Sequence, residues 1–171
     1  VFNDLNASSY TLYNPFGGTF VFTNDGTYTR NASGITTFQT TFDNNSTVNL
    51  ELGTITLNGG GTMSATSVVN ASSDTTFQFT NDYTLQTGAQ FTGAGAIQQT
   101  GGTLTIDGTL KASLFDWRSG NWNAASAATT TIDAATVLNL STSNNKDFDY
   151  RTINNLGTVN WYLGYIRSGH G

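Results

Sequence analysis

Apolar and polar residues alternate along most of the chain, in short runs that end at Gly, Asn or Asp. Such alternation places the apolar side chains of a run on one face of a β-strand and the polar ones on the other. Apolar residues do not recur at spacings of three and four residues over the length of a helix, so we expect many short strands and essentially no helix. The apolar positions of the runs are Phe20, Phe22, Val48, Leu50, Leu52, Ile55, Leu57, Phe77, Phe79, Leu104, Ile106, Leu138, Leu140, Val159 and Trp161.

The alternation also predicts which side chains form the core, because residues two apart in a strand share a face. The residues that we expect outside are Asn49, Glu51, Thr56, Gln78, Thr105 and Asn160. Those that we expect in one continuous, lumen-like core are Val48, Leu50, Leu57, Phe77, Phe79, Leu104, Ile106, Leu140, Val159 and Trp161.

Some segments of the chain resemble one another at long distances. Trp117–Trp122 matches Trp161–Ile166, and Thr47–Leu50 matches Thr158–Trp161. The separation of the two members of each pair is close to a multiple of about 22 residues, a length that accommodates one coil of three short strands. A third match, of Phe22–Asp25 with Phe79–Asp82, does not have such a separation, so we expect insertions or a shorter coil before Tyr83. A Gly-Thr step that opens strands marks the coil corners, at Gly18, Gly26, Gly53, Gly61, Gly102, Gly108 and Gly157.

These features predict an all-β parallel β-helix, or β-solenoid, with about eight coils of about 22 residues, which we expect to wind in the right-handed sense. The repeat region spans residues 18–171, and residues 1–17 fit the repeat poorly and form a cap, a linker or a docking segment. The alternative is an antiparallel sandwich or barrel, which also has many short strands and Gly-rich turns. Matches at whole-coil distances and the scarcity of two-residue hairpin signals favour the solenoid.

Two segments carry a resemblance to known repeats. One consists of Gly26–Arg30, Phe42–Leu50, Gly53–Leu57 and Gly59–Gly61, and the other consists of Thr129–Ile132, Val137–Leu140 and Arg151–Trp161. They resemble the Gly/Thr/Asn-rich β-helical repeats of very large surface proteins of planctomycetes, cyanobacteria and related bacteria. Such proteins look like adhesin-type or autotransporter-type β-helices. The resemblance implies display at a bacterial cell surface and a structural or adhesive role, and it carries over no catalytic residue.

Composition and charge narrow the function. Charged residues make up 10% of the chain, against roughly 25% in ordinary soluble domains, so hydroxyls and amides must cover the surface. An aromatic content of 12% and a single proline argue against disorder. The net charge of −5 offers no positive field to nucleic acid. Without cysteine the chain forms no disulfide, and no stretch approaches the roughly 18 apolar residues of a membrane span.

The single histidine gives the sharpest enzyme hypothesis. His170 lies in a Gly-His-Gly step, which also occurs in β-helical polygalacturonases together with a trio of aspartates. No adjacent pair of aspartates occurs in this chain, so the carboxylates that such catalysis needs are missing. We therefore expect no catalytic residue, no enzyme activity and no cofactor.

Asp147 and Asp149 flank Phe148 and are the other acidic candidates, for acid–base chemistry or for Ca²⁺. Calcium takes about six to eight oxygen ligands, and no Gly/Asp nonapeptide repeat supplies them. The interpretation that we prefer is a solvated loop in which Lys146 and Arg151 are the charge partners. No metal site is expected.

Aromatic side chains are the candidates for glycan contacts. Trp117, Trp122 and Trp161 occupy inward positions of the alternation, so we expect them to pack in the core rather than to stack on sugars. The outward candidates are Tyr28, Tyr83, Tyr162 and Tyr165. Regular Thr arrays would suggest ice binding, but the Thr-x-Thr pairs of this chain are unevenly spaced.

We therefore expect a non-enzymatic, extracellular structural or adhesive module that stacks end to end into a rod or filament at the cell surface. Its partner is either a further repeat of the same chain or a neighbouring subunit. The alternatives are a glycan-binding module, which requires outward aromatics on successive coils, and a carbohydrate-active β-helix enzyme, which requires a cleft lined by acidic and basic groups.

Overall fold

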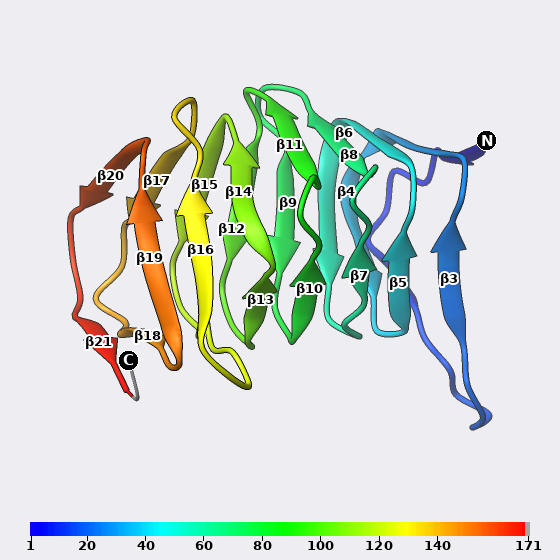
Figure 1. The fold of residues 1–171 in the computed structure, drawn as a ribbon. Coiled ribbons are helices and arrows are strands. Elements are labelled where there is room, and N and C mark those ends of the chain that lie inside the picture. The colour runs from blue at the N-terminus through cyan, green and yellow to red at the C-terminus, as the bar shows by residue number, and fades with distance from the viewer. Residues whose placement is uncertain (170–171) are drawn as a thin grey trace.

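A computed structural model describes residues 1–169, and in them the chain forms a parallel β-solenoid of about seven turns without any helix (Figure 1). The expected fold class is confirmed. The right-handed winding stays a prediction. Most turns carry strands on three faces, here named A, B and C, and strands of successive turns pair in parallel.

Face A consists of β3 (Val21–Asn24), β5 (Thr41–Asn44), β7 (Thr62–Met63), β10 (Tyr83–Leu85), β13 (Leu104–Ile106), β18 (Lys146–Phe148) and β21 (Ile166–Ser168). Single bridges of Asn121 to Thr103 and to Asp147 connect β13 to β18. Face B consists of β1 (Phe2–Asp4), the first parts of β4 (Thr27–Phe38) and β6 (Thr47–Leu57), β8 (Val68–Ala71), β11 (Gln90–Gly93), β14 (Gly108–Ala112), β16 (Ala128–Ile132) and β19 (Arg151–Asn155).

Face C consists of β2 (Tyr10–Leu12), the last parts of β4 and β6, β9 (Thr76–Phe79), β12 (Ala96–Gln99), β15 (Leu114–Trp117), β17 (Val137–Leu140) and β20 (Thr158–Trp161). Strands β4 and β6 turn the corner from face B to face C without a break, so these two faces belong to one sheet. Residues 1–17 contribute β1 and β2, both of which pair with β4 and therefore belong to the stack.

Stacking brings residues of successive coils into columns. On face C one inward column runs through the partners Ile55, Phe77, Ile97, Phe115, Leu138 and Val159. The coil that leads from Ile97 to Phe115 is shorter than the one that leads from Phe115 to Leu138. Because corners absorb these differences in length, the strands remain aligned although the repeat length varies.

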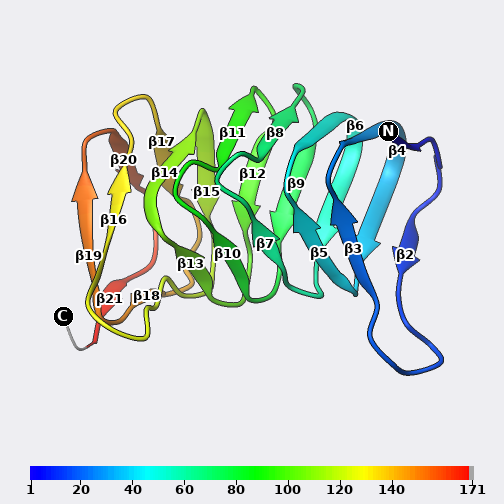
Figure 2. The same cartoon turned by 45° about the vertical axis from the view of Figure 1, so that its right-hand side comes forward.

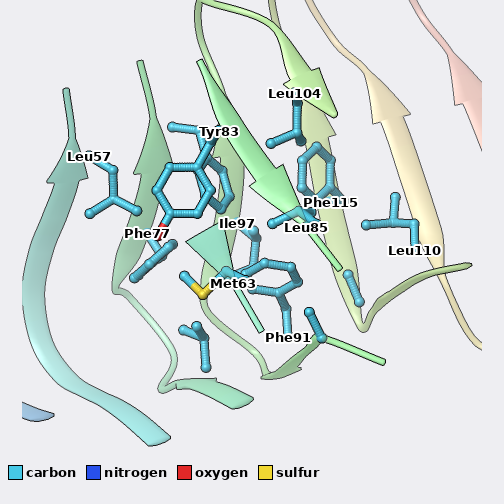
Figure 3. Close-up of a cluster of buried hydrophobic side chains, with 14 of the residues drawn as sticks. Leu57, Met63, Phe77, Tyr83, Leu85, Phe91, Ile97, Leu104, Leu110 and Phe115 are labelled. Carbon is cyan, nitrogen blue, oxygen red and sulfur yellow. The ribbon is translucent and has the colours of Figure 1, made fainter. Parts of the chain in front are cut away.

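The core follows the predicted alternation. Val48, Leu50, Leu57, Phe77, Phe79, Leu104, Ile106 and Leu140 are buried, and the predicted outward set is at least partly exposed. Side chains from the three faces meet in the interior, as Figure 3 shows for Tyr83 of face A, Phe91 of face B and Phe115 of face C. Two predicted core residues lie at the last coil and differ: Val159 is half-buried and Trp161 is 60% exposed.

Two tyrosines that we expected outside are buried, so this part of the prediction was wrong. Tyr28 pairs with Phe2 and Val48 at inward positions of face B, and Tyr83 pairs with Leu104 on face A. Their hydroxyl groups donate to the Asp4 carboxylate and to the Phe42 carbonyl oxygen. With these partners the phenol needs no water, so the ring can occupy a core position.

The matches at multiples of about 22 residues reflect the coil register only in part: Asn121 aligns with Arg167 through Asp147, so Trp122 and Ile166 are out of register. Trp117 and Trp161 lie in corresponding positions on face C, and the indole of each donates to the carbonyl of the glycine three residues on, at 3.0 Å and 2.8 Å. Thr47–Leu50, in contrast, lies on face B, whereas Thr158–Trp161 lies on face C. The match between these two segments is therefore one between strands of similar composition on different faces.

Glycine is required where a corner approaches the coil below. At Gly93, where φ is +90°, an added Cβ would overlap the Ala71 carbonyl oxygen. Both the left-handed backbone and the close contact exclude a side chain there.

No helix in the described part of the chain is long and apolar enough to cross a membrane.

The alternation can be tested with a pair of neighbouring substitutions in β9. Phe77→Ala should lower the free energy of unfolding by about 3–5 kcal/mol, because it leaves a cavity in the shared core. Gln78→Ala, which removes an outward side chain, should lower it by less than about 1 kcal/mol. Urea denaturation followed by circular dichroism measures both, and equal losses would contradict the register of face C.

Candidate functional site at the two ends of the solenoid

The sides of the solenoid are covered by polar side chains that bond to one another from coil to coil. On face B, Asn70 donates to Asn49 at 2.9 Å and Thr92 donates to Asn70 at 2.5 Å. On face C, Asn160 donates to Asn139 at 3.0 Å. These ladders leave the lateral surface with few strong charges and with many of its amides already engaged.

Exposed apolar side chains gather instead at the first and last coils. The large exposed apolar side chains that lie outside these two clusters are Ile35, Leu52 and Tyr150. Those at the N-terminal end are Val1, Phe2, Leu5, Tyr10, Tyr13, Phe16, Phe20 and Val21, and those at the C-terminal end are Leu156, Trp161, Tyr162, Leu163, Tyr165 and Ile166. Clusters of exposed apolar residues on a polar protein mark contact surfaces.

The N-terminal end has a buried polar cluster beside a hollow of about 300 Å³. The Asp4 carboxylate accepts hydrogen bonds from Tyr28 at 2.7 Å, from Arg30 at 2.8 Å and from Thr36 at 2.5 Å. Arg30 is completely buried and also donates to the Ser33 carbonyl. The cluster joins β1 to both parts of β4 and so attaches the first coil to the second.

The environment shifts the ionisation of this cluster. Burial alone raises the pKa of the Asp4 carboxyl, but the hydrogen bonds from Thr36, Tyr28 and Arg30 and the Arg30 charge outweigh it, so the pKa lies below its ordinary value. Burial and the neighbouring carboxylate raise the pKa of the Tyr28 hydroxyl far above its ordinary value. Asp4 is therefore charged and Tyr28 neutral at physiological pH.

At the C-terminal end the core opens into an apolar hollow of about 200 Å³. Among the described residues, β19, β20 and β21 each pair with one strand only, so no further coil covers this end. Trp161 is exposed for this reason, although it lies next to buried Leu140 in the stack. The hollow is lined by Trp117, Ile132, Leu138, Leu140, Phe148, Ile153, Asn155, Val159 and Ile166.

Two buried cations support the last coils. The Lys146 ammonium donates to the carbonyl oxygens of Thr142 at 2.6 Å and Asn144 at 2.8 Å. Arg151 donates to the carbonyl oxygens of Ile106 at 2.7 Å and Trp122 at 3.1 Å, which belong to different coils. Burial lowers the pKa of both groups. We expected Lys146 and Arg151 to be solvated partners of the nearby aspartates, and this was wrong, because backbone carbonyls take their hydrogen bonds.

The partner of Asp147 is Arg167, which sequence reasoning missed. The two form a bidentate pair, with both nitrogen–oxygen distances at 2.7 Å, and this pair lowers the pKa of Asp147. Asp147 and Arg167 are direct neighbours in the register of β18 and β21, a relation visible only once the coils are aligned. Asp149 accepts a hydrogen bond from the Tyr150 backbone at 3.1 Å. Within residues 1–169, no three His, Cys, Asp or Glu side chains are placed to hold a metal ion.

The remaining candidates divide between core and surface. Trp117 and Trp122 are buried and stack on each other with ring centroids 4.2 Å apart, which confirms their predicted packing role. Tyr162 and Tyr165 are exposed as predicted. His170 lies outside the described residues.

Comparison of the chain with protein-family models, with curated proteins and with solved structures finds no match.

The Asp4 cluster predicts a local effect of acid. Because the pKa of Asp4 is lowered on folding, its contribution to stability is present above the unfolded pKa and is lost as the pH falls through the folded one. Below about pH 4, β1 and β2 should therefore lose protection against hydrogen exchange before the central coils do. Exchange rates corrected for the intrinsic effect of pH measure this.

Asp4→Asn should abolish this pH dependence, with β1 and β2 unprotected throughout. Asp25→Asn is the control, because Asp25 is exposed and bonds only at the surface, to Asn45. A wild-type first coil that stays protected at low pH would show that Asp4 does not hold it in place.

Proposed function

We propose that this chain is a non-enzymatic structural or adhesive module, a stiff β-solenoid that extends end to end into a rod or filament at a bacterial cell surface. The observation that carries the proposal is the contrast between the sides and the ends. The sides are weakly charged and their amide ladders are internally bonded, whereas both ends expose apolar side chains and strand edges.

The physics of solenoids supports a mechanical role. Each coil is stabilised by its neighbours, so length can be added without changing the cross-section of the rod. An exposed strand edge with an adjoining apolar core is a template for the next strand. Both a further coil of the same chain and a neighbouring subunit satisfy these requirements.

Glycan binding is the second candidate function. It is favoured by Tyr162 and Tyr165, which are 63% and 71% exposed in the last coil. A multi-coil glycan platform would need aromatics on successive coils, but Asn58, Thr80 and Thr100 occupy the positions that correspond to Tyr162. Binding of soluble surface polysaccharides to the wild type and to a Tyr162→Thr/Tyr165→Asn variant separates this candidate from the first.

The structural proposal predicts the appearance of the native material. Negative-stain electron micrographs of the protein in its natural assembly should show rods of uniform width that vary in length, since coils add along one axis. Compact particles of fixed size would refute the proposal.

The protein should also show no turnover of polygalacturonate or related acidic polymers, because its acidic residues are scattered and Asp147 is paired with Arg167. Reducing-end and unsaturated-product assays on purified protein measure hydrolase and lyase activity. Turnover that His170→Ala abolishes would replace the structural proposal by an enzymatic one.

A further inference from the structure

The corner between faces C and A has equivalent positions in every coil. In most coils after the first, the backbone N–H of the first corner residue donates to the carbonyl of the last face-C strand residue one coil earlier. These bonds run from Gln39 to Leu12, Asn58 to Phe38, Thr80 to Leu57, Thr100 to Phe79, Arg118 to Gln99 and Tyr162 to Leu140. They align the corners independently of the varying coil length.

In the interior coils this corner is polar or Gly-rich, but in the two end coils it is aromatic. The last coil has Tyr162 and Leu163 where earlier coils have Asn58 and Gly59, or Arg118 and Ser119. The first coil has a long loop between β2 and β3 that carries Tyr13, Phe16 and Phe20, and Phe16 is 97% exposed. Figures 1 and 2 both show this loop extending beyond the neighbouring corners.

Packing among the described residues does not explain the composition of the end corners. Tyr13, Phe16, Tyr162, Leu163 and Tyr165 are each more than half exposed. Aromatic side chains exposed in this way are costly in water and are enriched where one protein surface covers another.

Each aromatic corner lies between two free strand edges. Among the described residues, β2 and β3 pair only with β4 and β5, while β20 and β21 pair only with β17 and β18. The register of face C continues unbroken from β2 to β20. Face B differs, because β14 pairs with β11 through its last residues and with β16 through its first. Face C, with the corner that follows it, is therefore the surface that retains its alignment along the rod.

We propose that a second copy of this chain docks head to tail, with the corner Tyr162–Tyr165 of one copy against the loop Tyr13–Phe20 of the next. Strand β20 then extends along β2, and β21 along β3. Inward-facing Trp161 and Val159 meet Leu12 and Tyr10 of the next copy, which closes the apolar hollow. This inference rests on the proposed function and names its partner.

A second copy is the occupant because both halves of the contact occur on the same chain, in the same column, at opposite ends. The stacking within the chain already shows how one such coil lies on another. Since the two surfaces differ, the contact is heterologous and repeats without closing.

The test uses the 171-residue chain and two variants that give the end corners the polar character of interior ones. The first variant carries Tyr162→Thr, Leu163→Ser and Tyr165→Asn, and the second carries Tyr13→Thr, Phe16→Ser and Phe20→Thr. Leu52→Thr is the matched control, because Leu52 is an exposed apolar residue far from both corners. Circular dichroism verifies that all variants retain the strand content of the wild type.

Sedimentation velocity over a concentration series should show wild type and Leu52→Thr forming species that grow in length. Each corner variant alone should stay monomeric, with a dissociation constant raised at least about tenfold. An equimolar mixture of the two should form dimers and nothing larger, because it contains one intact pair of corners.

Three results would overturn the inference: a monomeric wild type, self-association of either corner variant alone, or a mixture that does not form dimers. A monomeric wild type together with rods in the native material would refute this contact and leave the proposed function standing. Compact native particles would refute both.

Discussion

Parallel stacking in register is the constraint on which the rest of this structure depends. Strands of successive coils lie about 4.8 Å apart, so every residue has a neighbour of equivalent position directly above and below it. A column can exchange Ile55 for Phe77 or Leu138, because all are apolar and the core interdigitates. A column cannot change from inward to outward, since a slip of one residue would move every apolar side chain of a strand to the solvent face. Corner residues are under a different constraint, and there glycine is required where the chain contacts the coil below.

Among the described residues, the buried charged side chains belong to the first two and the last two coils. Asp4 and Arg30 neutralise each other between the first two coils, and Lys146 and Arg151 bond to backbone carbonyls between the last ones. A buried charge is tolerated only with such partners. Both cations donate to backbone carbonyl oxygens, and Arg151 in this way connects two different coils. The central coils, whose columns are continuous, need no such groups.

The same constraint explains which features of the structure could be predicted from the sequence. Alternation identified the strands and most of the core, because burial in a strand depends on a local period of two. The prediction failed at Tyr28 and Tyr83, where the residue type was given more weight than the inward position in the alternation. It also failed at Trp161, which has an inward position but lies in a coil that no further described coil covers. The match of Thr47–Leu50 with Thr158–Trp161 was misleading because similar strands occur on different faces. Because the coils on either side of Phe115 differ in length, no fixed repeat length describes the whole chain.

The end surfaces were the part least accessible from sequence. Tyr162 was recognised as exposed, but nothing in its local sequence relates it to Asn58 or to Tyr13. That relation depends on hydrogen bonds between coils, which define the corner column. Likewise the pairing of Asp147 with Arg167 depends on the register of β18 and β21 rather than on any motif.

A strand edge alone is a poor determinant of how two rods join. Backbone N–H and C=O groups repeat along every strand, so a free edge accepts another strand in several registers and on any face. Aromatic side chains that are restricted to one corner remove this ambiguity. They are fully buried in just one orientation of one copy about the rod axis relative to the other. Specificity then arises from the difference between the matched and the mismatched arrangements rather than from the strength of strand pairing. In the proposed head-to-tail contact, the restriction of aromatics to the two end corners is what would orient one rod on the next.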